Sequence, residues 1–178
     1  DAIGMPPKLV ERFRAIVQRP NGLVLVTGPT GSGKTTTLYS ALSELNSLEK
    51  KLITVEDPVE YRLPGINQVQ VNEKIELSFA RVLRSALRQD PDIVLVGEMR
   101  DQETVKAALS AAETGHFVMS TLHTTDARET ITRVIDFFPP HEQQQIRLSL
   151  AAALKGIICQ RLVPRADNLG RCVAMEIC

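Results

Sequence analysis

The sequence Gly28-Pro29-Thr30-Gly31-Ser32-Gly33-Lys34-Thr35 joins an apolar run at residues 23–27 to a segment that carries Leu38, Leu42 and Leu45 at helical spacing. It matches the pattern G-x-x-x-x-G-K-[S/T] at every required position. Glycine allows successive backbone N–H groups to turn inward around a phosphate, and the start of the following helix adds the positive end of its dipole. We therefore predict a phosphate-binding P-loop and, with it, an α/β fold.

Each part of this loop has a predicted role in holding ATP and Mg²⁺. The Lys34 ammonium would hold the β- and γ-phosphates, and the Thr35 hydroxyl would complete the shell of Mg²⁺. The residues predicted to bind the nucleotide here are Gly28, Thr30, Gly31, Ser32, Gly33, Lys34, Thr35 and Thr36. Two alternatives stay open at this point: a flexible glycine turn that happens to contain a lysine, and a P-loop that binds nucleotide without hydrolysing it.

Apolar runs and helical periodicity alternate along the rest of the chain. The runs that predict strands buried on both faces of a sheet lie at 23–27, 52–55, 93–96 and 117–122, with short strands around 66–71. Helices are predicted at 7–19, after 33, at 78–88, at 102–113, after 126 and at 142–158. A final hairpin at 158–177 would turn at Asp167-Asn168-Leu169-Gly170. This alternation predicts one α/β domain over residues 1–178, with a mostly parallel sheet, helices on both faces and a C-terminal β-hairpin.

Composition limits the possible classes of protein. The formal net charge is zero, so no overall basic field indicates nucleic acid, and we expect no nucleic-acid partner. The three cysteines lack the close spacing of a zinc site or a redox pair, so we expect reduced thiols in a cytosolic protein and no zinc. No apolar run approaches the length that spans a bilayer. The chain begins at Asp1 and stops at Cys178, and both ends look cut from something longer.

Acidic residues follow two of the predicted strands, where ligands of an open parallel sheet bind. Glu98 follows the run at 93–96, in the place where P-loop proteins put the carboxylate that orients the water shell of the metal. Glu56 and Glu60 follow the run at 52–55 and could activate the attacking water. The neutral interpretation is that Asp57 only forms a turn and that Glu60 is solvated.

Histidines and arginines supply further candidates. His116 and His123 bracket the run at 117–122, and a histidine after a strand can sense the γ-phosphate by hydrogen bonding. Arg84 and Arg88 are four residues apart and share a helix face, so either could neutralise phosphoryl charge across a subunit interface. Surface salt bridging is the equal alternative for these arginines, and a structural role is the alternative for each histidine.

Three further stretches resemble the motifs of the secretion-superfamily ATPases, which drive type II secretion and type IV pilus assembly or retraction. The stretch at 87–101, Leu-Arg-Gln-Asp-Pro-Asp-Ile-Val-Leu-Val-Gly-Glu-Met-Arg-Asp, is similar to their Walker B signature. Residues 54–61 resemble their Asp box, and residues 114–125 resemble their His box. With the P-loop, all of these motifs occur in the family's order, and the similarity covers essentially the whole chain.

The resemblance implies a RecA-like motor domain that works in a ring hexamer, with ATP between neighbouring subunits. It implies that Glu60 is the better catalytic carboxylate, that Glu98 supports Mg²⁺ through water, and that His123 approaches the γ-phosphate. It also implies a preceding PAS-like domain, C-terminal helices, and an inner-membrane platform protein as partner at the cytoplasmic face of the membrane. Arginines from the preceding domain would complete the site.

The branch within the family is less clearly marked. Secretion and assembly members usually carry a four-cysteine zinc element after the Gln-Arg-Leu that matches 160–162, whereas residues 163–170 contain no cysteine and run directly into a stretch similar to the retraction motors. Residues 111–116 also favour retraction, whereas 69–74 and 35–39 look more like the secretion and assembly branch. We expect a motor for type IV pilus retraction and twitching motility, with type II secretion or pilus assembly as the alternative. A nucleic-acid translocase and a non-hydrolysing nucleotide switch are the rivals from other classes.

Overall fold

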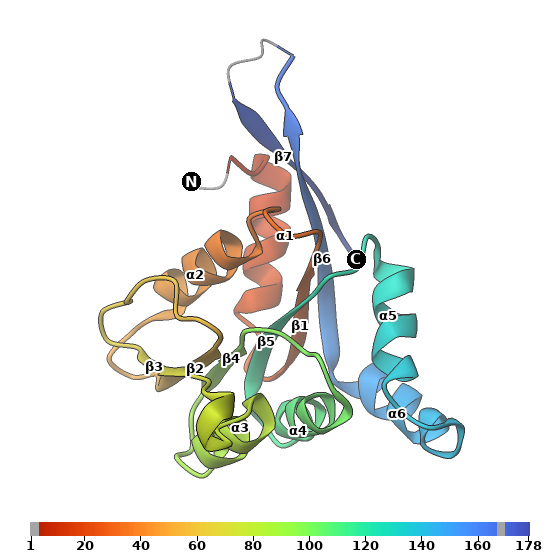
Figure 1. The fold of residues 1–178 in the computed structure, drawn as a ribbon. Helices are drawn as coiled ribbons and strands as arrows, with labels where there is room; N and C mark the ends of the chain where they lie inside the picture. The colour runs from red at the N-terminus through yellow and green to blue at the C-terminus, as the bar shows by residue number, and fades with distance from the viewer. Residues whose placement is uncertain (1–3, 167–169) are drawn as a thin grey trace.

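A computed structural model describes residues 4–166 and 170–178 of the chain (Figure 1). The strands are β1 (Gly22–Thr27), β2 (Leu52–Glu56), β3 (Asn67–Gln70), β4 (Ile93–Val96), β5 (Phe117–Leu122), β6 (Leu154–Pro164) and β7 (Arg171–Ile177). The helices are α1 (Pro7–Val17), α2 (Lys34–Leu45), α3 (Phe79–Leu87), α4 (Gln102–Glu113), α5 (Ala127–Asp136) and α6 (Pro140–Ala153), with a short 3₁₀ turn at Glu73–Ile75. Among the described residues, no helix is both long and apolar enough to cross a bilayer.

All strands belong to one seven-stranded sheet, in the order β3-β2-β4-β5-β1-β6-β7. Every neighbouring pair is parallel except β6 and β7, which form an antiparallel hairpin. The predicted α/β class, the mostly parallel sheet and the C-terminal hairpin are confirmed. Of the predicted hairpin turn, Asp167, Asn168 and Leu169 lie outside the described residues, and Gly170 has a φ of 103°.

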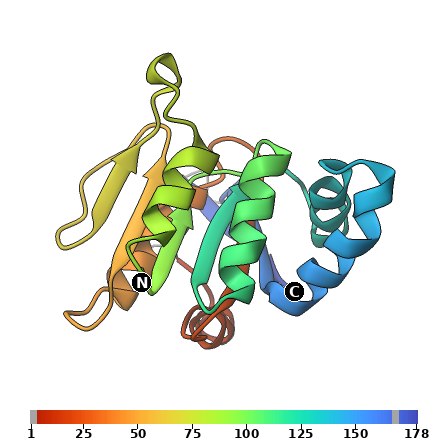
Figure 2. The same ribbon diagram turned by 90° about the horizontal axis from the view of Figure 1, so that it is seen from below.

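The sheet is covered on both faces, so successive strand residues enter two different cores. Leu23 and Leu25 of β1 belong to the core under α3, α4 and α6. Val24 and Val26 belong to the core under α1 and α2. All four side chains are at most 1% exposed. Figure 2 shows α3 and α4 side by side on one face of the sheet. Burial on both faces explains why these strands are apolar throughout rather than alternating.

The chain leaves helix α6 earlier than its periodicity predicts. We predicted a helix over 142–158, but the helix ends at Ala153, and Leu154 begins β6. The strand β1 needs a second neighbour, and β6 supplies it by parallel pairing, with Val24 opposite Gly156 and Leu25 opposite Ile157. The spacing of apolar residues alone does not separate a buried helix from a buried strand, which is why the prediction was wrong here.

Because strands β1 to β6 are parallel, their carboxyl ends all lie at one edge of the sheet. The P-loop, residues 28–35, follows β1 at this edge. The loop after β2 and the residues after β4 and β5 meet it there, and β6 passes alongside. In Figure 1 the β6–β7 hairpin extends beyond this edge, away from the helical layers. This edge therefore holds the candidate site.

Candidate active site

The P-loop has the backbone that its glycines predict. Gly28, Gly31 and Gly33 all have positive φ, at 145°, 76° and 88°. At Gly28 a Cβ would lie 2.2 Å from the carbonyl oxygen of Gln160, so no larger residue fits. Gly33 precedes α2 without a side-chain cap, so capping groups do not occupy the first N–H groups of this helix. Such free N–H groups at a helix start form an anion site.

Lys34 is folded back over the loop. Its Nζ donates to the carbonyl oxygens of Gly28 and Pro29, at 2.8 and 3.1 Å, and the residue is 9% exposed. Burial lowers the pKa of Lys34, and the nearby Glu98 carboxylate partly opposes that shift. The ammonium thus lies in a position where phosphate oxygens can replace carbonyl oxygens as acceptors. Ser32 Oγ is buried with no hydrogen-bond partner among the described residues, so this hydroxyl is available to donate to a phosphate oxygen.

Gln160 contacts both the P-loop and α2, and it is not one of the predicted site residues. Its Nε2 donates to the carbonyl oxygen of Ser32 at 2.7 Å, and its Oε1 accepts from Thr37 Oγ1 at 2.8 Å. The side chain comes from β6, which neighbours β1, and it is only 2% exposed. The sequence predicts a helix over 142–158, whereas these residues from Leu154 onward form β6 beside β1. The role of Gln160 depends on that pairing and so could not be predicted.

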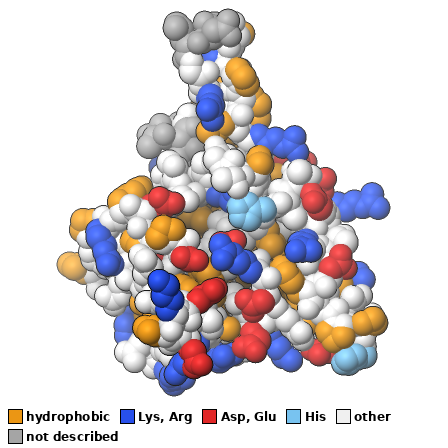
Figure 3. All heavy atoms as spheres, viewed as in Figure 1, with side chains coloured by type: hydrophobic (Ala, Val, Ile, Leu, Met, Phe, Trp, Pro, Cys, Tyr) orange, Lys and Arg blue, Asp and Glu red, His pale blue; other side chains and the backbone are white. Residues whose placement is uncertain are grey.

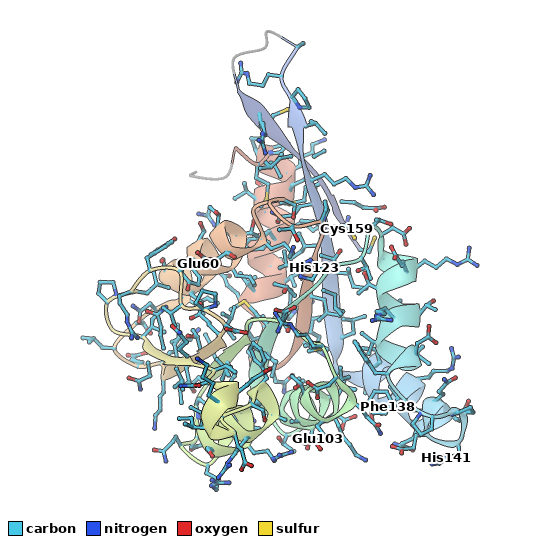
Figure 4. The ribbon with its side chains drawn as sticks, viewed as in Figure 1. Glu60, Glu103, His123, Phe138, His141 and Cys159 are labelled. Atoms are coloured by element: carbon cyan, nitrogen blue, oxygen red, sulfur yellow. The ribbon has the colours of Figure 1, made fainter. Side chains whose placement is uncertain are left out.

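Beside the P-loop lies a cavity of about 740 Å³. The residues that line it are Thr30, Gly31, Gly33, Lys34, Thr35, Thr36, Leu38, Tyr39, Glu56, Asp57, Pro58, Glu60, Phe79, Leu95, Gly97, Glu98, Arg100, Thr121, His123 and Leu162. The chain thus brings together the P-loop, the acidic residues after β2 and β4, and the histidine after β5. In Figure 4, Glu60 lies on the loop side near α2, and His123 lies at the end of β5 near β6.

Glu98 is the centre of a charged cluster in this cavity. One carboxylate oxygen pairs with Arg100, and the other lies 3.6 Å from His123 Nε2. The same Arg100 lies 3.6 Å from Asp57, so one guanidinium bridges the acidic residues at the ends of β4 and β2. The pKa of Arg100 is raised, chiefly by its hydrogen bond to Glu98. Among the described residues that line the cavity, Arg100 is the only arginine, and it was not among the predicted site residues. Its place two residues after Glu98 was the available signal.

The carboxylates after β2 have different surroundings. Glu60 is exposed and lines the cavity. Glu56 is 4% exposed, and its carboxylate accepts hydrogen bonds from Tyr39, Thr54 and Gln68. Burial raises the pKa of Tyr39, and the bond to Glu56 adds to that effect. These contacts give Glu56 the environment of a structural anchor, whereas Glu60 is free to meet a ligand.

The remaining predicted residues do not reach this cavity. His116 precedes β5, at the opposite edge of the sheet, where its Nδ1 lies 3.1 Å from the carbonyl oxygen of Ala111. Arg84, on α3, pairs with Glu103 at 3.4 Å, and Arg88, directly after α3, donates to Ser85 Oγ at 3.1 Å; both arginines are exposed. Within one chain, the structure therefore does not bring His116, Arg84 or Arg88 to the cavity. For His116 the reason is that the two ends of a strand lie at opposite edges of the sheet.

Comparison with known proteins connects this geometry to a family. The family model described as "Type II/IV secretion system protein" matches residues 1–176. Type II secretion system protein E of Xanthomonas campestris pv. campestris is 51% identical over 93% of this chain, and the type IV pilus assembly ATPase PilB of Thermus thermophilus is 50% identical over 92%. The crystal structure of the pilus retraction motor PilT with bound ADP superimposes over 99% of this chain, with a TM-score of 0.88 and 48% identity.

The chain spans only part of each relative, namely 28% of the Xanthomonas protein, 18% of PilB and 51% of the PilT chain. The family match nevertheless covers nearly all residues of the chain, and the predicted resemblance to the secretion ATPases is confirmed. The mostly parallel sheet with helices agrees with the RecA-like fold of these proteins. The chain belongs to the type II/IV secretion system protein family of RecA-like ATPases.

Proposed function

We propose that this chain binds ATP with Mg²⁺ and hydrolyses it. The observation that supports this best is the convergence of Lys34, Glu60, Glu98 and His123 on one cavity beside an uncapped helix start. Lysine and backbone N–H groups neutralise phosphate charge, and a carboxylate within the same cavity can take a proton from water. The PilT structure holds ADP, which supports the same type of ligand here.

In this proposal each residue of the site has one role in the reaction. The P-loop N–H groups and Lys34 hold the β- and γ-phosphates, so that the terminal phosphate faces the ends of β2, β4 and β5. The Glu60 carboxylate accepts a proton from the attacking water. His123 hydrogen-bonds to the γ-phosphate. Positioning and charge neutralisation supply most of the rate in this chemistry, because the protein forms no covalent bond to the phosphate.

The residues present fit a magnesium ion. Thr35 and Glu98 both line the cavity and offer oxygen ligands, which are the ligands that Mg²⁺ prefers. The ion would neutralise charge on the β- and γ-phosphates. We assign Thr35 as a direct ligand and Glu98 as a holder of the metal's water. The Glu98 carboxylate pairs with Arg100 in this structure. Arg100 would therefore have to share or release the Glu98 carboxylate if the ion were bound.

We further propose that hydrolysis drives a motor for type IV pilus retraction. The full-length protein would act as a homo-hexamer at the cytoplasmic face of the inner membrane and would move an inner-membrane platform protein. The feature that favours retraction is the link between β6 and β7, since residues 163–170 contain no cysteine and so cannot form the four-cysteine zinc element of the other branch. The similarity to PilT agrees with this role.

Type II secretion or pilus assembly is the second candidate. It is favoured by the relatives named type II secretion protein E and PilB, which are as similar in sequence as PilT. Residues 69–74 and 35–39 also look more like that branch. Gene replacement decides between the two. Loss of retraction with normal pilus assembly and secretion supports our proposal, whereas loss of pili or of secreted enzymes supports the alternative.

Two rivals from other classes have less support. Figure 3 shows acidic and basic side chains interspersed on the visible face, without a continuous basic track for a nucleic acid. A nucleotide switch without turnover would not need a carboxylate as exposed to the cavity as Glu60. Steady phosphate release by the full-length hexamer, unchanged by added DNA, is the expected result. Binding without release would show a switch, and stimulation by DNA would show a translocase.

A further inference from the structure

Gln68, on the edge strand β3, makes several hydrogen bonds but has no role in the hydrolysis proposed above. Its Oε1 accepts from the backbone N–H of Leu63 at 2.6 Å. Its Nε2 lies 3.1 Å from the carbonyl oxygen of Tyr61, 3.2 Å from Glu56 Oε1 and 3.5 Å from Tyr39 Oη. Because the only donor among the backbone partners faces Oε1, and acceptors face Nε2, the orientation of the amide is fixed by its surroundings.

These contacts connect the chain segments that form one wall of the nucleotide cavity. Leu63 and Tyr61 belong to the loop at 57–66 between β2 and β3, which carries Glu60. Glu56 ends β2, and Tyr39 lies on α2, the helix that begins with Lys34. One amide therefore ties the loop of the proposed catalytic carboxylate to the helix that follows the P-loop.

Besides Gln68, other contacts hold the loop: Asn46 Nδ2 donates to the carbonyl oxygen of Pro64 at 2.9 Å, and a backbone hydrogen bond joins Glu60 to Tyr39. The ends of the loop are fixed by the parallel pairing of β2 with β3, in which Val55 lies opposite Val69. Between these ends, the Tyr61 ring meets the Tyr39 ring edge-on at 4.7 Å between centroids, next to the Gln68 amide. Glu60 directly precedes Tyr61, whose carbonyl accepts from Gln68. A shift of this short piece would move the Glu60 carboxylate with it.

We propose that Gln68 is a positioning residue that sets the place of Glu60 relative to the bound γ-phosphate. Glu56 and Tyr39 form the buried support to which Gln68 is hydrogen-bonded, because the Glu56 carboxylate accepts from both Tyr39 and Gln68. This inference rests on the proposed hydrolysis with Glu60 as the base. It assigns Gln68 no contact with nucleotide, so its loss slows the chemical step and leaves ATP binding to the P-loop intact.

The test compares three variants of the full-length protein. Gln68→Ala removes the amide. Gln68→Glu keeps its shape but removes both N–H donors and places a second carboxylate beside Glu56. Asn67→Ala is the matched control, because Asn67 is the exposed neighbour on the same strand. We expect kcat for ATP to fall about ten- to a hundredfold in both Gln68 variants, since a misplacement on the order of 1 Å costs about that much. KM and nucleotide affinity should stay within about twofold, and Asn67→Ala should behave as wild type.

Hydrogen–deuterium exchange supplies a readout that does not depend on turnover. Peptides that cover 57–66 should exchange faster in both Gln68 variants, whereas peptides that cover 28–36 should not change. A kcat equal to that of Asn67→Ala, or unchanged exchange at 57–66, overturns the positioning role and leaves the proposed hydrolysis standing. A raised KM with unchanged kcat also overturns it, because that result places Gln68 in binding. A wild-type protein that binds ATP but releases no phosphate instead refutes hydrolysis, and the positioning role with it.

Discussion

Gln160 and Ser32 are far apart in sequence, yet Gln160 Nε2 donates a 2.7 Å hydrogen bond to the carbonyl oxygen of Ser32 in the middle of the P-loop. The same amide accepts from Thr37 Oγ1 on α2. The phosphate-binding loop is therefore held in shape by a strand that is the last parallel member of the sheet, as well as by its own glycines.

Gln160→Leu should weaken nucleotide binding, because a buried carbonyl oxygen and a buried hydroxyl both lose their partner. The cost of such unpaired groups is about 1–3 kcal/mol. We expect a Kd for ATP raised by about tenfold or more, measured by isothermal titration calorimetry. Gln145→Leu on the exposed side of α6 serves as the control. An unchanged Kd would show that the P-loop keeps its shape without β6.

Lys34→Ala should abolish turnover, since no other cation in the loop can replace the ammonium at the phosphates. Steady phosphate release by the full-length protein should fall by about two to three orders of magnitude. Lys155→Ala, which removes an exposed lysine from β6, should leave the rate unchanged. Normal hydrolysis by Lys34→Ala would refute the P-loop mechanism.

Glu60→Gln and Glu98→Gln should both slow hydrolysis by at least about a hundredfold while nucleotide remains bound, but for different reasons. Glu60→Gln removes the proton acceptor and should leave the Mg²⁺ requirement unchanged. Glu98→Gln weakens the hold on the metal's water and should raise the Mg²⁺ concentration needed for half-maximal rate. Glu113→Gln, at an exposed helix end, is the charge control. If instead Glu60→Gln raised the Mg²⁺ requirement and Glu98→Gln left it unchanged, Glu60 would be the residue that supports the metal and Glu98 the proton acceptor.

Arg100→Ala should lower the Mg²⁺ requirement for nucleotide binding. The guanidinium pairs with Glu98 and lies 3.6 Å from Asp57, so its loss frees negative charge for the metal. Because Arg100 is half exposed, the effect should be small, about two- to fivefold in the apparent Mg²⁺ affinity, read from the binding of a fluorescent ATP analogue. Arg147→Ala on α6 controls for net charge. A raised Mg²⁺ requirement would indicate that Arg100 binds phosphate instead.

Tyr39→Phe should lower the free energy of unfolding by about 1–3 kcal/mol at neutral pH, because the buried Glu56 loses a hydrogen-bond donor. Burial and Glu56 raise the pKa of Tyr39 in the folded chain, so its stabilising contribution is complete below the unfolded pKa of about 10. As the pH rises above that value, the unfolded chain loses its proton first, and the contribution declines.

Urea unfolding at neutral and alkaline pH checks this sign. The difference between wild type and Tyr39→Phe should narrow on the alkaline side, whereas Tyr61→Phe, whose ring is half exposed, should unfold as wild type at both pH values. A difference that widens with pH would contradict the raised pKa.

Much of the architecture could be predicted because the signals are local. Apolar runs such as Leu23–Val26 are buried on both faces. The helix predicted at 78–88 is α3, and Ser78 caps it by accepting from the N–H of Arg81. The end of α6 could not be predicted in this way. Leu154 and Ile157 continue the helical spacing, and only the open side of β1, which no local pattern reveals, makes them a strand.

The candidate site follows the same division. Lys34, Glu98 and Glu60 come from motifs, and the structure places them around one cavity. Gln160 and Gln68 reach the site through side-chain contacts that depend on strand order, so spacing in the sequence does not reveal them. Arg100 had a local signal, its place two residues after Glu98. His116 shows the reverse case. It lies near His123 in a motif, but the length of β5 separates them across the sheet.

The strand order also dictates when the nucleotide site can form as the chain leaves the ribosome. The strand before the P-loop lies between β5 and β6, so Gly22 pairs with Phe117 and Leu23 with Leu154. Contacts of such large sequence separation form late and slowly. The phosphate-binding loop is thus synthesised well before Gln160 but completed only after Gln160 has emerged. Until then β1 presents an unpaired edge, and unpaired strand edges make a partly folded chain prone to aggregation.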